Sequence, residues 1–280
     1  MKVSKGNIIL IVILVFLVIM GIKNLKNEKS LNQSILKEVT LVADGKVNPD
    51  NNGKLVLVSG KISFEGNIGF LELENPIESF KVVRTVQDFV SYKSDDGKTH
   101  YEWKERKEED RANVSDSSSS YLFSTTQTIP VKVGEFNLDD KGMELVNASA
   151  SYVTKEIAGL EYNGLEYTNK GHDDPEPGDV SLSYTYFDCS KYDSLSILAK
   201  QTGTTFSPYT LGKEEVYRVY NGKVDTMEKL TQELDEQVQR GKRGKIAFII
   251  LILVVAGVLF YNSKKQASEG KKESSETKAE

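Results

Sequence analysis

The sequence predicts a membrane-anchored, mostly β domain of the α+β class, placed between two transmembrane helices. Two apolar runs without any charged residue, 8–22 and 246–261, lie near the two ends of the 280-residue chain. With 39% hydrophobic and 28% charged residues, the chain is too apolar for a disordered protein and is typical of a folded one. Between the two runs, the apolar residues mostly alternate with polar ones or form short runs, which is typical of β-strands.

Both apolar runs predict membrane spans. A bilayer core of roughly 30 Å needs about 20 helical residues, with a lower limit near 17. The runs are slightly shorter, but the lysines and arginines beside them can reach the interface with their long side chains. A buried core helix would carry a polar face, and neither run has one. A cleaved signal peptide would show a small-residue cleavage site, whereas the basic segment Lys23–Lys29 follows the first run, so we expect an uncleaved signal anchor.

Charge does not decide the orientation, because basic residues near the span ends are balanced between the two sides. A signal-like start followed by a long folded region favours export of the middle region across the cell membrane. The predicted order is a cytoplasmic N-terminus (1–7), a span (8–22), a mostly β extracytoplasmic domain (23–223), a membrane-proximal amphipathic helix (224–245), a second span (246–261) and a disordered cytoplasmic tail (262–280).

In the first half of the domain, local patterns predict one helix and several strands. Leu31, Ile35 and Val39 recur at four-residue intervals and indicate a short amphipathic helix over residues 28–39. Turn-forming residues over 44–53 precede an apolar strand. The expected strands are 55–62, which reaches a glycine bend, 68–73, 80–92, and a return strand containing Tyr101 and Trp103 after the hairpin signal Asp95-Asp96-Gly97.

The second half continues as short strands after a charged, serine-rich loop over residues 105–120. Pro130 favours an edge position for the next strand, because proline cannot donate a ladder hydrogen bond. The expected elements are strands over 128–133 and 136–138, a hairpin within 159–170, and strands over 180–187, 195–201 and 215–220.

The segment 224–240 is predicted to be an amphipathic helix, with Asp225 and Glu228 as a capping pair. Its apolar stripe consists of Val224, Met227, Leu230, Leu234 and Val238. The stripe has two interpretations: the helix packs on its own domain, or it presents a surface to a partner or to the membrane. On the second interpretation, Leu230 and Leu234 would contribute to self-association.

Composition restricts the functional classes. The single Cys189 excludes an intramolecular disulfide framework, which for an exported domain favours a bacterial surface. A pI near 5.4 gives no reason to expect nucleic acid as a partner.

Candidate catalytic and metal-binding residues are few and isolated. His100 lies in a charged hairpin, and Cys189 has no histidine near it in sequence. A cation site is conceivable, but two prolines in this stretch favour a solvated turn. Its candidate ligands are His172, Asp173, Asp174, Glu176 and Asp179. Tyr101 and Trp103 could line a binding face, although alternating aromatics are more often part of a sheet core. We therefore predict no enzyme, and no catalytic, cofactor-binding or metal-binding residues.

Four segments together resemble the transmembrane protein 43 (LUMA) family. They are residues 48–60 (NPDNNGKLVLVSG), Tyr101-x-Trp103, Pro177-Gly178-Asp179, and residues 199–209 (AKQTGTTFSPY). The resemblance implies a membrane protein whose large domain lies in a lumen or outside the cell. For eukaryotic members it implies a role in organising the nuclear envelope and endoplasmic reticulum membrane through self-association and protein partners. This chain, which we take for a bacterial member, departs from the better-known members in having one C-terminal span instead of several.

The expected function is therefore that of a non-enzymatic membrane-organising scaffold or oligomerising module. Its expected partners are the lipid bilayer, other copies of the chain and unidentified membrane proteins, with no cofactor and no nucleic acid. The alternative is a ligand-binding or sensing ectodomain at the cell envelope.

Overall fold

The chain forms two compact units in the computed structural model, Val39–Thr226 on the one hand, and Met1–Glu38 together with Met227–Glu280 on the other. The structure describes residues 27–109, 122–154, 156–157, 159–162, 167–168 and 174–242. Both predicted spans and both predicted cytoplasmic termini lie outside these residues. Over the described ranges, none of the helices has the length and apolar character needed to cross a bilayer.

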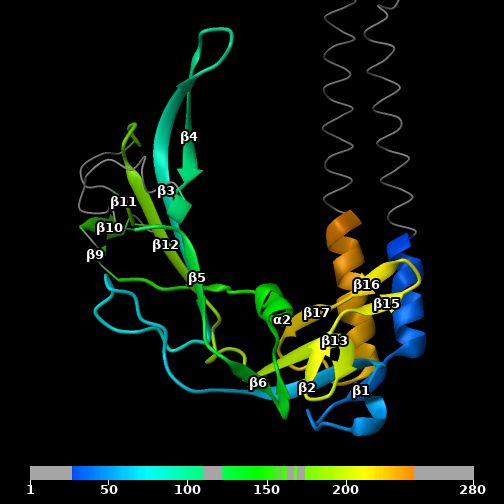
Figure 1. The fold of residues 1–280 in the computed structure, drawn as a ribbon. Coiled ribbons are helices and arrows are strands. Elements are labelled where there is room, and N and C mark those ends of the chain that lie inside the picture. Colours follow the sequence, from blue (N-terminus) through cyan, green and yellow to red (C-terminus); the bar gives the residue numbers. More distant parts are fainter. Residues whose placement is uncertain are drawn as a thin grey trace, which may run out of the picture. The chain divides into compact units, whose positions relative to one another are not determined.

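The unit Val39–Thr226 is mostly β, as the sequence predicts, and contains two larger sheets (Figure 1). The first sheet has the order β14-β13-β2-β6-β7, while β1 pairs with β2 and β17 with β13. All its pairs are antiparallel except β1 with β2. Its strands are β1 (Thr40–Val42), β2 (Leu55–Phe64), β6 (Val131–Val133), β7 (Phe136–Asn137), β13 (Ser194–Thr202), β14 (Thr205–Ser207) and β17 (Arg218–Asn221).

The second sheet has the order β4-β3-β12-β11-β10-β9, while β5 pairs with β3 and β8 with β12. Its strands are β3 (Lys81–Lys93), β4 (Thr99–Glu105), β5 (Thr125–Thr128), β8 (Ala150–Ser151), β9 (Glu156–Ile157), β10 (Leu160–Tyr162), β11 (Tyr167–Thr168) and β12 (Val180–Tyr186). The remaining elements of this unit are a small ribbon of β15 (Tyr209–Leu211) and β16 (Glu214–Val216), the helix α2 (Asp140–Leu145) and the 3-10 turn η1 (Pro49–Asn51).

Each sheet has its own hydrophobic cluster. The first cluster includes Val56, Val58, Phe136 and Ile197, and the second includes Val82, Val86, Leu160 and Leu182. Residues around the start of β3 contribute to both, since Phe80 belongs to the first cluster and Val82 to the second.

Three glycines explain why the predicted bend at the end of 55–62 is absent. Gly60 lies inside β2, where a Cβ atom would come within 2.5 Å of the Gly134 nitrogen. Gly134 has φ +62°, and a Cβ there would collide with the carbonyl of Gly45. Gly60 is therefore required by the close approach of three backbone segments, and β2 continues through it to Phe64.

Three predicted strands need correction. Residues 68–73 form no strand, and only an isolated bridge joins Ile68 to Ile77, because this irregular segment places the Glu72 carboxylate in the interior next to Arg84. The predicted strand 128–133 is divided around Pro130 into β5 and β6, which pair with different strands. The predicted strand 215–220 is likewise two strands, β16 and β17, with different partners.

The other unit contains, among its described residues, helices over 27–38 and 227–242. Asn32 donates from its side-chain nitrogen to the Leu234 carbonyl at 3.1 Å, which joins the two helices. Leu230, Leu234 and Val238 are all buried, with Leu230 at 0% exposure. The stripe is therefore occupied within the chain, and the prediction that it forms a self-association surface is wrong.

The start of the second helix differs slightly from the predicted one. The helix begins at residue 227, after Asp225, whose carboxylate forms an ion pair with Lys223 at 3.0 Å.

Candidate functional site

Among the residues that the structure describes, the candidate histidine and acidic residues are not assembled into a reactive centre. His100 lies on exposed β4, where its ring stacks on Tyr92 at 5.5 Å and its Nε2 is 3.1 Å from the Ser94 hydroxyl. His172 and Asp173 lie outside the described residues. The Asp179 carboxylate accepts the Glu176 backbone N–H at 2.8 Å and so closes a turn. The described residues contain no group of three or more His, Cys, Asp or Glu side chains that could hold a metal ion.

Cys189 is half-buried beside a hollow of about 420 Å³, whose lining contains no histidine. Its thiol lies 3.8 Å from the Phe187 carbonyl oxygen. Burial raises the pKa of the Cys189 thiol to about 11, so it is protonated at neutral pH. Because the thiolate is the nucleophile, this environment suits a packed thiol and not a reactive one.

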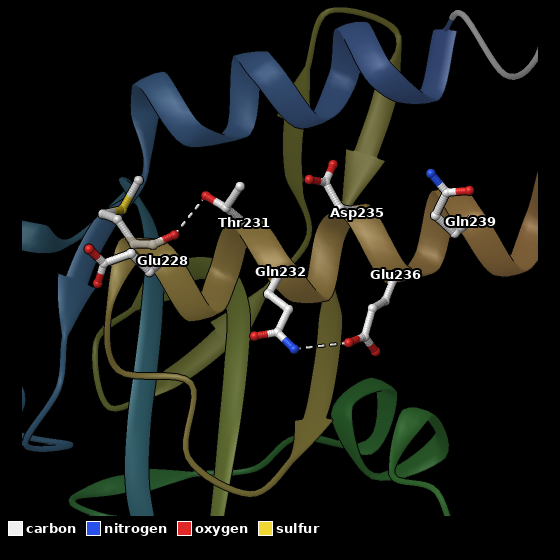
Figure 2. A pocket seen from close by; sticks show the side chains of 7 residues that line it. Glu228, Thr231, Gln232, Asp235, Glu236 and Gln239 are labelled. Carbon is white, nitrogen blue, oxygen red and sulfur yellow. Dashed lines mark hydrogen bonds between the residues drawn. The ribbon is translucent and has the colours of Figure 1, made fainter.

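The outer face of the C-terminal helix forms a shallow surface that is lined by residues of that helix alone (Figure 2). The Thr231 hydroxyl donates to the Met227 carbonyl at 2.7 Å, and the Gln232 side chain donates to Glu236 at 3.0 Å. These contacts are made within the helix and leave no convergent set of groups around a ligand. The surface is therefore the solvated face of an amphipathic helix.

A buried ionic cluster, which the sequence did not indicate, fixes the irregular segment after Ile68. The Arg84 guanidinium lies 2.5 Å from Glu72, whose side chain is 2% exposed, and it also donates to the Phe123 carbonyl at 2.8 Å. The Tyr184 hydroxyl donates to the same Glu72 oxygen, and burial followed by this hydrogen bond raises the pKa of Tyr184. The cluster has a structural role, because all its charges are paired within it.

A second ion pair, between buried Arg106 and half-buried Asp88, extends the contacts of β3 beyond the end of β4. Arg106 is 3% exposed and forms a two-pronged contact with Asp88, with Nε 2.9 Å from Oδ2. Its backbone N–H donates to the Val86 carbonyl at 2.8 Å. The sequence placed this arginine in a loop, since no local pattern distinguishes it from the charged residues around it.

The most distinctive exposed feature is the far half of the β3–β4 hairpin (Figure 1). Strand β12 pairs with β3 only from Val82 to Asp88, so the hairpin continues as two strands. Phe89 contacts Trp103 at 5.1 Å and Tyr101 at 6.1 Å between ring centroids. Because side chains alternate along a strand, Phe89, Tyr101 and Trp103 share one face of the hairpin, and the Tyr92–His100 pair lies on the other. We define the hairpin surface as Phe89, Tyr101 and Trp103.

The hairpin surface is partly exposed although it is aromatic. Tyr101 is 58% exposed, Phe89 and Trp103 are half-buried, and on the opposite face Tyr92 is 48% exposed. The expectation that Tyr101 belongs to a sheet core is therefore wrong, because the two-stranded part of the hairpin has no further strand beside it to form one. Exposed aromatic patches of this kind are typical of interaction surfaces.

Comparison with known proteins gives one match. The transmembrane protein 43 family matches residues 98–264, a range that starts at the β3–β4 turn and includes the apolar run 246–261. The segment 48–60, which contributed to the resemblance, lies outside this range. No curated protein and no solved structure matches the chain. Because the match covers more than half of the sequence, the chain belongs to the transmembrane protein 43 family and is a membrane protein.

Proposed function

We propose that this chain is a non-enzymatic scaffold of the cell membrane, which organises the bilayer by assembling with copies of itself and with other membrane proteins. In this proposal it has two spans, 8–22 and 246–261, and its β domain is extracytoplasmic. The hairpin surface is the observation that carries the proposal, since tyrosine and tryptophan are enriched in protein interfaces.

Membrane anchoring supports assembly through a small surface. Chains confined to one bilayer meet at a raised effective concentration, so contacts too weak for association in solution become sufficient. The non-enzymatic part of the proposal is supported by the raised pKa of the Cys189 thiol and by the contacts of His100 on exposed β4, where its ring stacks on Tyr92 and lies beside the Ser94 hydroxyl.

The proposed topology is tested with single cysteines on a Cys189→Ser background. Lys213→Cys, in the exposed turn between β15 and β16, should react with a membrane-impermeant maleimide in intact cells. Ser274→Cys, in the proposed cytoplasmic tail, should react only after lysis. The opposite pattern would show that the β domain faces the cytoplasm.

The proposed assembly is tested by crosslinking two differently tagged copies in native membranes with a lysine-reactive reagent. Tagged copies should be recovered together, and mass spectrometry should identify peptides joined between them. If neither the second copy nor another membrane protein is captured, the scaffold role is contradicted and the alternative of a ligand-binding ectodomain gains support.

A further inference from the structure

Along β4, the backbone N–H and C=O groups of successive residues point alternately toward β3 and away from it. At one end of the β3–β4 pairing the Ser94 N–H donates to the Lys98 carbonyl at 2.9 Å, and at the other the Arg106 N–H donates to the Val86 carbonyl at 2.8 Å. Antiparallel pairs alternate between those that exchange hydrogen bonds and those that do not. Glu102 and Lys104 therefore direct their backbone groups toward β3.

The intervening residues Tyr101, Trp103 and Glu105 consequently direct their N–H and C=O groups away from β3. The phase is confirmed on the other strand, where Phe89, the partner of Trp103, donates its N–H at 2.8 Å to the Asp179 carbonyl on the side opposite β4.

This edge has no strand beside it among the described residues. Strand β5 also pairs with β3 on the side where β4 lies, but with a different part of it: β5 pairs with Lys81–Arg84 and β4 with Gln87–Lys93. Strand β5 therefore does not pair with the outer edge of β4. An unpaired strand edge is a template for pairing with another chain, and proteins that leave one open commonly protect it by charge.

We propose that a second copy of this chain occupies the β4 edge, with the two β4 strands antiparallel about a two-fold axis at Trp103. The inference rests on the proposed oligomerising role and names the surface and the partner. Each Trp103 then lies opposite its counterpart, and Tyr101 lies opposite the partner's Glu105. These are the residues whose backbone groups point away from β3, so these pairs exchange the hydrogen bonds between the two copies. The two hairpins join into one four-stranded sheet.

Side-chain charge selects this register over its neighbours. With the axis at Trp103, Glu102 of each copy lies opposite Lys104 of the other, so two ion pairs form. With the axis at Glu102, two carboxylates face each other, and with the axis at Lys104, two ammonium groups do. Directly opposed like charges destabilise an antiparallel pair, whereas opposite charges and aromatic pairs stabilise it.

The pairing would also stabilise the two-stranded part of the hairpin. An isolated two-stranded hairpin is marginal in water, and three or more strands are needed for independent stability. Beyond Phe89 each hairpin has only β3 and β4, with the aromatic side chains exposed. Joining two hairpins supplies the missing strands and brings the Trp103 and Tyr101 rings of both copies to one face.

The register is tested by disulfide formation in native membranes, in the full chain with Cys189→Ser. Glu102→Cys copies carrying one tag are coexpressed with Lys104→Cys copies carrying another and treated with a mild oxidant. Opposed residues in non-hydrogen-bonded pairs have Cα atoms about 4.5 Å apart, within disulfide range, while diagonal pairs are about 7–8 Å apart and beyond it. The mixed disulfide should exceed that of either variant alone several-fold.

Other outcomes of this experiment overturn the proposal. Predominant dimers of Glu102→Cys alone would place the axis at residue 102, and dimers of Lys104→Cys alone would place it at 104. A disulfide to a different protein, with none between copies, would show that another protein pairs with the outer edge of β4. The control Lys213→Cys, exposed but far from this strand in the sequence, should form no more dimer than background.

Charge reversal provides an independent test with a rescue. Glu102→Lys replaces both ion pairs by repulsion and should lower the crosslinked fraction roughly tenfold. Adding Lys104→Glu restores opposite charges across the axis and should recover most of the signal, despite the proximity of Lys104 to Asp88 on β3. Failure of the rescue in a chain that keeps its protease resistance contradicts the proposed pairing.

The same membranes separate this inference from the proposed function. If the lysine-reactive reagent joins tagged copies while no 102–104 disulfide forms, the edge pairing is wrong and the oligomerising role remains. If neither the disulfide nor the lysine-reactive reagent joins the copies, both the edge pairing and self-association are contradicted, and the scaffold role then depends on the capture of another membrane protein.

Discussion

At the residue scale, buried polar groups hold irregular backbone in place. Lys81 is 6% exposed and donates from Nζ to the carbonyls of Met143, Glu144 and Val146 at 2.7, 2.9 and 2.7 Å. These carbonyls lie at the C-terminal end of α2, where the helix dipole favours a cation and the last carbonyls accept hydrogen bonds from outside the helix. Burial lowers the pKa of Lys81, and the charge of Glu144 opposes that shift.

We predict that two buried tyrosines make stability fall at alkaline pH. Burial, and then hydrogen bonds to Glu72 and Asp139, raise the pKa values of Tyr184 and Tyr217 in the folded chain. An unfolded tyrosine loses its proton near pH 10, so above that pH the unfolded state binds fewer protons than the folded one. The free energy of unfolding should therefore decrease as pH rises above about 10.

Urea unfolding at pH 8 and pH 10.5 measures this effect. Tyr184→Phe and Tyr217→Phe should lose less stability between the two pH values than the parent chain does. The stability of each variant at pH 8 serves as its own baseline, because it already includes the cost of the lost hydrogen bond. Equal losses in parent and variants would assign the alkaline sensitivity to other groups.

At the scale of elements, the first sheet depends on a site where glycine backbones touch. Gly45, Gly60 and Gly134 come from three segments, and the Glu135 N–H donates to the Gly45 carbonyl at 2.8 Å. No side chain fits between these backbones, so the pairing of β2 with β6 requires glycine at residue 60.

Gly60→Ala should therefore destabilise the β domain by about 3 kcal/mol, because its Cβ would meet backbone that cannot rotate away. The matched control is Gly97→Ala in the β3–β4 turn, where φ is +80° and no atom lies within 4 Å of the added Cβ. Its cost should be about 1 kcal/mol from backbone strain alone. Thermal unfolding of both variants checks the difference, and equal costs would show that the sheet can shift to admit a methyl group.

The apolar stripe of the C-terminal helix leads to a different element-scale prediction. Leu234 is 1% exposed, and its carbonyl accepts the Asn32 amide, so Leu234→Ala should destabilise the packed helices by about 2–5 kcal/mol. Glu236→Ala, on the exposed face, should stay within about 0.5 kcal/mol of the parent chain. Limited proteolysis of the chain in detergent compares the two variants. If Leu234→Ala instead weakened self-association without changing protease resistance, the stripe would be an interface between copies of the chain.

At the scale of the whole molecule, both hydrophobic clusters lie inside one of the two units. Both hydrophobic clusters consist of residues between Val42 and Val219, inside the unit Val39–Thr226.

A fragment of residues 39–226 should accordingly fold without the two helices and the apolar runs. We expect a β-rich circular dichroism spectrum and a cooperative thermal transition. A fragment without such a transition would show that the helices are part of the folding unit.

The sequence by itself determined those features that depend on near neighbours in the chain. Alternation predicted β12, the Asp95-Asp96-Gly97 turn predicted the β3–β4 hairpin, and helical spacing predicted both helices. It also brought Tyr101 and Trp103 to attention, and its motifs pointed to the family that residues 98–264 match. These signals are readable because each is set by steric and hydrogen-bonding preferences within a few residues.

Only the tertiary structure decided which groups meet across long separations. Gly60 meets Gly134, Glu72 is buried beside Arg84 and Tyr184, and the Leu234 stripe is covered within the chain. The exposure of Tyr101 and the open edge of β4 depend in the same way on where β12 stops pairing with β3. Such outcomes follow from the packing of segments dozens of residues apart, and a side chain of the same type can be buried in one packing and exposed in another.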